Sequence, residues 1–85
     1  MLDENKKFTS EQFQPSFIGK TVSIQVFTRT GYTMRAVDPA SLHKHVGVLQ
    51  MYVVTPQVTK FRLVGGDVIE THPTKNYMEL FVAVP

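Results

Sequence analysis

The fold of this chain depends on one stretch of sequence, DPASLHKHVGVLQMYVV at residues 38–54. Its start is typical of a helix N-terminus, because Asp38 can accept hydrogen bonds from free backbone N–H groups and Pro39 is preset for the first helical position. Apolar residues then follow at spacings of four, three and four, which gathers them on one helical face. They are Leu42, Val46, Leu49 and Val53. This pattern predicts a helix over 38–54.

The same stretch has an extended alternative. Gly47 costs about 1 kcal/mol relative to alanine inside a helix, and the local excess of valine favours a strand. A strand over 46–54 is therefore the second interpretation, and the two interpretations lead to different folds.

Segments rich in β-forming residues lie on both sides of residues 38–54. Val22, Ile24 and Val26 occupy alternate positions, which is the period of a half-buried strand. Gly31 can take the positive φ that a turn requires, so the segments before and after it are predicted to form a β-hairpin. The predicted extended segments are 21–27, 32–37, 60–64, 67–70 and 77–84.

Length and composition predict one small domain. A chain of 85 residues buries only about 60–65% of its unfolded surface. We expect residues 1–19, which are polar with scattered aromatics, to form an N-terminal arm, partly flexible or packed on the sheet, and residues 20–85 to form a single compact domain.

The absence of cysteine excludes disulfides and cysteine-based zinc sites. No run approaches the roughly 18 apolar residues of a membrane span, and residues 1–7 lack a signal-peptide core. We therefore expect a cytoplasmic protein without a membrane partner.

Motifs that carry catalysis or metal binding are missing from the sequence. The carboxylates are isolated along the chain, and no nucleophile elbow, zinc-protease motif or phosphate-binding glycine loop is present. His43 and His45 would point about 200° apart on a helix and would share a face only on a strand. We predict no catalytic residue, no metal site and no cofactor, and we expect that the protein is not an enzyme.

The order of the predicted elements, with a hairpin, a helix, a proline loop, a strand, a glycine turn and further strands, resembles the ubiquitin-like (β-grasp) superfamily. Residues 26–33 resemble the first hairpin of ubiquitin with its Thr-x-Thr-Gly turn, and residues 61–68 resemble its third strand and following turn. The resemblance covers about 21–84 and implies an α+β fold, in which a mixed sheet of four or five strands packs on one helix. Conjugated members end in Gly-Gly, whereas this chain ends in FVAVP, so the resemblance does not imply a conjugated modifier.

Strand parity on such a sheet predicts an exposed aromatic and basic face. Phe27 and Phe81 are expected to lie near one another, facing away from the helix, with Arg35 and Arg62 at the flanks. Aromatic residues beside arginine are favoured at protein interfaces. We therefore expect a non-enzymatic protein-interaction module or small regulatory adaptor. The predicted protein-binding residues are Phe27, Arg29, Arg35, Arg62 and Phe81.

Other interpretations follow if residues 46–54 are a strand. Five or six strands could then close into a small all-β barrel of the OB, SH3 or Sm type, and residues 61–69 resemble the second Sm motif. This fold predicts a single-stranded nucleic-acid-binding protein, with contacts from Lys20, Arg29, Arg35, Lys60 and Arg62. The net charge of +2 is too small to establish such binding by itself.

Three explanations of the aromatic face remain open beside a separate partner protein. Phe13 or Phe17 of the N-terminal arm could fold across the sheet and cover Phe27 and Phe81. A homodimer could bury this face, since a small chain gains stability by association. The protein could also be a structural subunit or a small inhibitor within a larger assembly.

Overall fold

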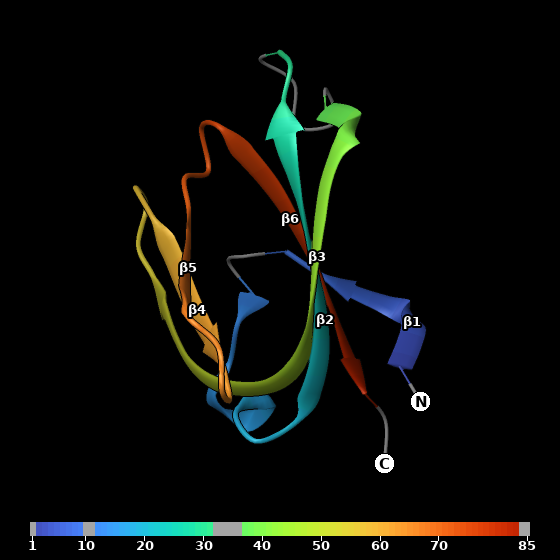
Figure 1. Ribbon diagram of the computed structural model, residues 1–85, viewed down its shortest axis with the longest axis vertical. Coiled ribbons are helices and arrows are strands. Elements are labelled where there is room, and N and C mark those ends of the chain that lie inside the picture. Colours follow the sequence, from blue (N-terminus) through green and yellow to red (C-terminus); the bar gives the residue numbers. More distant parts are fainter. Residues whose placement is uncertain (1, 10–11, 32–36, 84–85) are drawn as a thin grey trace.

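The protein is a single antiparallel sheet that bends back on itself (Figure 1). The computed structural model describes residues 2–9, 12–31 and 37–83. The six strands follow the order β1-β6-β2-β3-β4-β5 across the sheet. Their bounds are Leu2–Phe8 for β1, Thr21–Arg29 for β2, Val37–Val54 for β3, Thr59–Leu63 for β4, Val68–Thr71 for β5 and Asn76–Ala83 for β6, and a short 3-10 turn, η2, spans Pro15–Phe17.

The described residues contain no α-helix, and the decisive stretch lies within one long strand, β3. The predicted helix over 38–54 is therefore wrong. The α+β, ubiquitin-like β-grasp fold is wrong with it, because that fold packs its sheet on this helix. The chain has the all-β class of the alternative interpretation, with residues 46–54 extended. No helix that could cross a membrane is found among the described residues.

The apolar spacing of β3 imitates a helix because the strand carries two alternations with a register shift between them. The first part pairs with β2 up to Val48, and the second pairs with β4 from Leu49 onward. The register shifts between Leu49 and Met51, so Gln50 is an extra residue that changes which parity faces inward. Leu49 is buried, whereas the other three residues of the supposed stripe, Leu42, Val46 and Val53, are exposed.

Gly47 lies where β3 turns from one half of the sheet to the other. It is opposite Val22 on β2, so any side chain at this position would point toward the core. A Cβ built there would lie 3.3 Å from both Cβ and Cδ1 of Leu63 on β4. The glycine therefore leaves room for β4 to approach the bend closely.

The core lies between the two halves of the bent sheet. In Figure 1, β3 curves around one end of the molecule and carries β4 and β5 to the side opposite β2 and β6. The inward residues of these strands are fully or nearly fully buried. The core consists of Phe13, Phe17, Val22, Ile24, Val26, Leu49, Phe61, Met78, Leu80 and Val82.

The first 19 residues contribute both backbone pairing and core side chains. Phe13 stacks on Tyr52 with ring centroids 5.0 Å apart, and Phe17 packs against Phe8 at the same centroid distance. These phenylalanines fill the inside of the bend and belong to the core cluster or pack against it. They therefore do not cover Phe27 and Phe81, which lie on the opposite face of the sheet.

β1 joins the sheet at β6, the last strand of the chain. The pairing is antiparallel and sets Leu2 opposite Ala83. The start of β1 and the end of β6 accordingly lie side by side (Figure 1).

Candidate protein-binding face

The first half of β3 has its polarity reversed relative to an ordinary half-buried strand. His43 and His45 are opposite the buried residues Val26 and Ile24 of β2, so both lie on the core side of the sheet, where His45 is half-buried and His43 is exposed. The alternate positions face outward and are mostly aliphatic. Their exposed fractions are 42% for Leu42, 57% for Val46 and 36% for Val48. A strand that directs its aliphatic side chains to the outside is typical of a surface that another molecule covers.

We use the term outer face for the outward side chains of β6, β2 and the first half of β3. It consists of Tyr77, Glu79, Phe81 and Ala83 from β6, of Thr21, Ser23, Gln25 and Phe27 from β2, and of Leu42, Lys44, Val46 and Val48 from β3. The strand registers arrange these side chains in rows that run across the sheet.

A polar row crosses the middle of the outer face. Gln25 lies opposite Glu79 on one side and opposite Lys44 on the other. Glu79 forms an ion pair with Lys7 of β1, with Nζ and Oε2 3.0 Å apart. The row therefore carries a carboxylate that is paired with Lys7 at its β6 end and the ammonium group of Lys44 at its β3 end.

An apolar row lies next to this polar row. Ser23 sits between Phe81 of β6 and Val46 of β3. Its side chain is 1% exposed, and its hydroxyl oxygen has no hydrogen-bond partner among the described residues. The neighbouring side chains therefore shield the Ser23 hydroxyl from solvent although it lies on the outer side of the sheet, while Val46 in the same row stays exposed.

The aromatic residues predicted for this face do lie on it. Phe27 is opposite Tyr77, with ring centroids 6.4 Å apart. Phe81 lies four residues farther along β6 than Tyr77, which is about 14 Å at the usual rise of a strand. Phe27 and Phe81 are both half-buried and are separated by the polar row, so the prediction that they lie near one another is wrong.

Arg29 lies at the far end of β2 and is held by the turn between β5 and β6. Its Nε donates to the carbonyl oxygens of Pro73 at 2.7 Å and of Asn76 at 3.2 Å. Its guanidinium carbon lies 5.6 Å from the ring centroid of Tyr77. These contacts give Arg29 a role in fixing the turn against the outer face.

The other basic residues do not join Arg29. Arg62 is exposed on β4 and donates from Nε to the carbonyl oxygen of Gly66 at 3.1 Å, while Lys60 lies opposite Glu70 on the same strand pair. Lys20 precedes β2 at the end opposite Arg29, which is about 30 Å away along the strand. Arg35 lies outside the described residues. The described members of the predicted nucleic-acid-binding set are therefore spread over different ends and faces of the molecule.

The inward histidines of β3 lie at the margin of the core. The ring of His45 meets Phe61 edge-on, with centroids 5.7 Å apart. Burial lowers the pKa of His45, and the neighbouring charge of His43 lowers it further. Among the described residues, no three histidine or carboxylate side chains are placed to hold a metal ion together.

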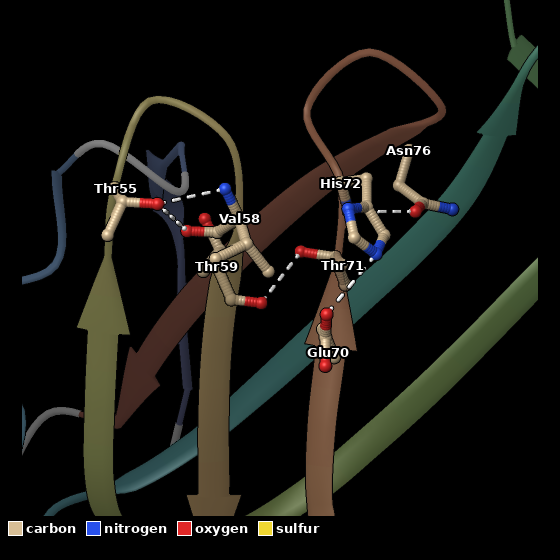
Figure 2. Close-up of polar contacts among 7 residues, drawn as sticks. All are labelled: Thr55, Val58, Thr59, Glu70, Thr71, His72 and Asn76. Carbon is tan, nitrogen blue, oxygen red and sulfur yellow. Dashed lines mark hydrogen bonds and ion pairs between the residues drawn. The ribbon is translucent and has the colours of Figure 1, made fainter.

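Hydrogen bonds from threonine side chains link the ends of β3, β4 and β5 (Figure 2). Thr55 closes the turn to β4 through its hydroxyl, which accepts from the N–H of Val58 at 3.0 Å and donates to its carbonyl at 3.1 Å. Thr71 donates to the carbonyl oxygen of Thr59 at 3.4 Å. These groups stabilise the connections between strands.

The loop after β5 is held in a similar way (Figure 2). The backbone N–H of His72 donates to Oδ1 of Asn76 at 3.1 Å, and its imidazole lies 3.3 Å from the carboxylate of Glu70. Both of these side chains are about half exposed. The contacts explain the shape of the loop.

Sequence reasoning missed the aliphatic part of the outer face. The predicted helix assigned Leu42 and Val46 to a buried stripe, so neither was considered as a surface residue. The alternation of Leu42, Val46 and Val48 with His43, His45 and Gly47 was the available signal, because it separates aliphatic residues from imidazoles with the period of a strand.

Comparisons of the chain with protein-family models, with curated proteins and with solved structures found no significant match.

Proposed function

We propose that this domain is a non-enzymatic protein-binding module that recognises its partner through the outer face. The observation that carries the proposal is the reversed polarity of β3. Leu42, Val46 and Val48 are exposed on the outer face, while His43 and His45 lie on the core side of the sheet, with His45 half-buried and His43 exposed. In a free monomer this arrangement leaves aliphatic surface in water, and covering that surface would be favourable.

The neighbouring strands supply the other features of a protein interface. Phe27, Tyr77 and Phe81 add half-buried aromatic area, and the row of Lys44, Gln25 and Glu79 supplies directional polar contacts across the face. Interfaces combine an apolar centre with polar groups that fix orientation. Single-stranded nucleic acid is the less favoured ligand, because the described basic residues that it would need do not form one surface.

The test places a photo-crosslinking amino acid at position 46 of the full chain, in the cells that produce the protein. A matched control places it at Thr74, which is exposed on the turn after β5. We expect position 46 to crosslink to a defined protein that position 74 does not capture.

The captured protein is then purified, and its affinity for the wild-type chain and for Val46→Glu is measured by calorimetry. Val46→Glu should weaken binding at least tenfold, while Thr74→Glu should leave it unchanged. Equal crosslinking at the two positions, or equal affinity of the two variants, would refute the proposal. Binding of a random oligonucleotide that falls steeply with salt and is lost in Arg62→Glu would instead support the nucleic-acid interpretation.

A further inference from the structure

We propose that the partner of the outer face is a second copy of this chain, so that two sheets pack face to face around a two-fold axis parallel to β2. This inference rests on the proposed function, because it names the occupant of the same face. It follows from the positions of charged and apolar side chains relative to β2.

The charges on the outer face are arranged antisymmetrically about the central strand. Lys44 and Glu79 lie in one row, on opposite sides of Gln25. Glu79 also pairs with Lys7 of its own copy at 3.0 Å, so its carboxylate would lie between Lys7 and the Lys44 of the other copy. A two-fold axis along β2 exchanges the two sides of the sheet and keeps each row at its own height. Lys44 of one copy is then placed over Glu79 of the other, and this contact occurs twice in a symmetric dimer.

The same axis matches the apolar rows. Val46 and Phe81 lie in one row on opposite sides of Ser23, so Val46 of one copy covers Phe81 of the other. Val48 lies opposite Thr21 at the end of the face that also contains Ala83. The polar row thus meets a polar row and the apolar row meets an apolar row, as packed sheets with nearly aligned strands require.

Repulsion between the two Lys44 side chains disfavours the other face-to-face arrangement. A two-fold axis across the strands and through the polar row would place Lys44 over Lys44, with no carboxylate paired to either, and would place the two Lys7–Glu79 pairs over one another. Like charges opposed in an interface are strongly unfavourable. Lys44 takes part in no other ion pair within the described part of the chain, so its charge is free to select the first arrangement.

The experiment measures the mass of the full chain by sedimentation equilibrium over a range of concentrations. We expect wild type to be dimeric, and Lys44→Glu and Glu79→Lys each to weaken the dimer roughly tenfold to a hundredfold, because each change opposes like charges twice. An equimolar mixture of the two variants should restore association. In the mixed dimer the two substituted side chains face one another with opposite charges, and the native Lys44 of one copy meets the native Glu79 of the other.

Controls separate charge pairing from damage to the fold. Lys75→Glu changes the charge equally on an exposed turn outside the outer face and should leave the dimer unchanged. Circular dichroism should show the same strand content in all variants.

Two results would overturn the inference in different ways. A wild-type monomer at every concentration would exclude self-association, while crosslinking of position 46 to a different protein would keep the proposed function. A dimer that is insensitive to both substitutions, or one that the mixture does not restore, would show that the two copies meet in another arrangement.

Discussion

Replacing Gly47 with alanine tests whether the bend of β3 depends on the absence of a side chain. The new Cβ would lie 3.3 Å from Cβ and Cδ1 of Leu63. Leu63 Cδ1 can move away by rotation, but its Cβ is fixed to the backbone of β4. One strand must therefore shift by a few tenths of an ångström. Overpacking of this kind costs typically about 1–3 kcal/mol, whereas the lower chain entropy of alanine recovers about 0.5–1 kcal/mol.

The net expectation is a loss of about 1 kcal/mol in the free energy of unfolding, or a Tm lower by about 4–8 °C for a domain of this size. Gly47→Val should lose more, because its extra methyl groups enter the same space. Urea unfolding followed by circular dichroism measures both changes. Gly66→Ala is the matched control, since its nearest contact is the carbonyl oxygen of Leu63 at an ordinary 3.5 Å. If Gly47→Ala is as stable as wild type, the argument that the bend requires glycine is refuted.

Three further substitutions test the core and its titration. Phe13→Ala should cost about 3 kcal/mol in thermal unfolding, since it removes a buried ring stacked on Tyr52; a change below about 1 kcal/mol would show that the N-terminal segment is not part of the core. Thr59→Val should raise the free energy of unfolding by about 1 kcal/mol, because the hydroxyl is fully buried without a partner among the described residues, and lower stability would reveal a partner for that hydroxyl. His45→Gln tests pH dependence. Because the folded state lowers the pKa of His45 from 6.5, the unfolded chain binds a proton at this residue at a higher pH than the folded chain does. The free energy of unfolding of wild type should therefore be unaffected by His45 above pH 6.5 and should fall as the pH drops from 6.5 toward the folded pKa. Urea unfolding on both sides of pH 6.5 should show a shallower decline for His45→Gln, and an unchanged slope would contradict the assignment.

Simple alternation was enough to predict most of the strands. The predicted segments 21–27, 60–64, 67–70 and 77–84 each lie within one or two residues of the observed β2, β4, β5 and β6. In β2, for example, Val22, Ile24 and Val26 have a single period of two and one buried face. Where a strand keeps one parity from end to end, its sequence pattern is sufficient.

β3 could not be predicted in the same way because its parity changes in the middle. Leu49 points inward before the extra residue Gln50, and Tyr52 points inward after it, so the inward positions change from odd to even residue numbers. The apolar spacing across this change is close to that of a helix. β1 was missed for a different reason. Its partner, β6, lies at the other end of the sequence, and local composition carries no information about such pairing.

The candidate site was partly visible in the sequence. Parity assigned Phe27 and Phe81 to one outward face, and the structure places them there. The grouping of arginines around them depended on the incorrect fold. Arg29 is bound to the β5–β6 turn, and Arg62 lies on the other half of the sheet.

The pairing of β1 with β6 also determines how the domain responds to mechanical force. Because Leu2 lies directly opposite Ala83, tension applied through these two residues acts across the ladder, along the hydrogen bonds rather than along the strands. The bonds between β1 and β6 would then break one pair after another, and β1 would peel off before the force reaches the bend and its core. A pull on Leu2 and Ala83 therefore unzips this domain from the edge of its sheet.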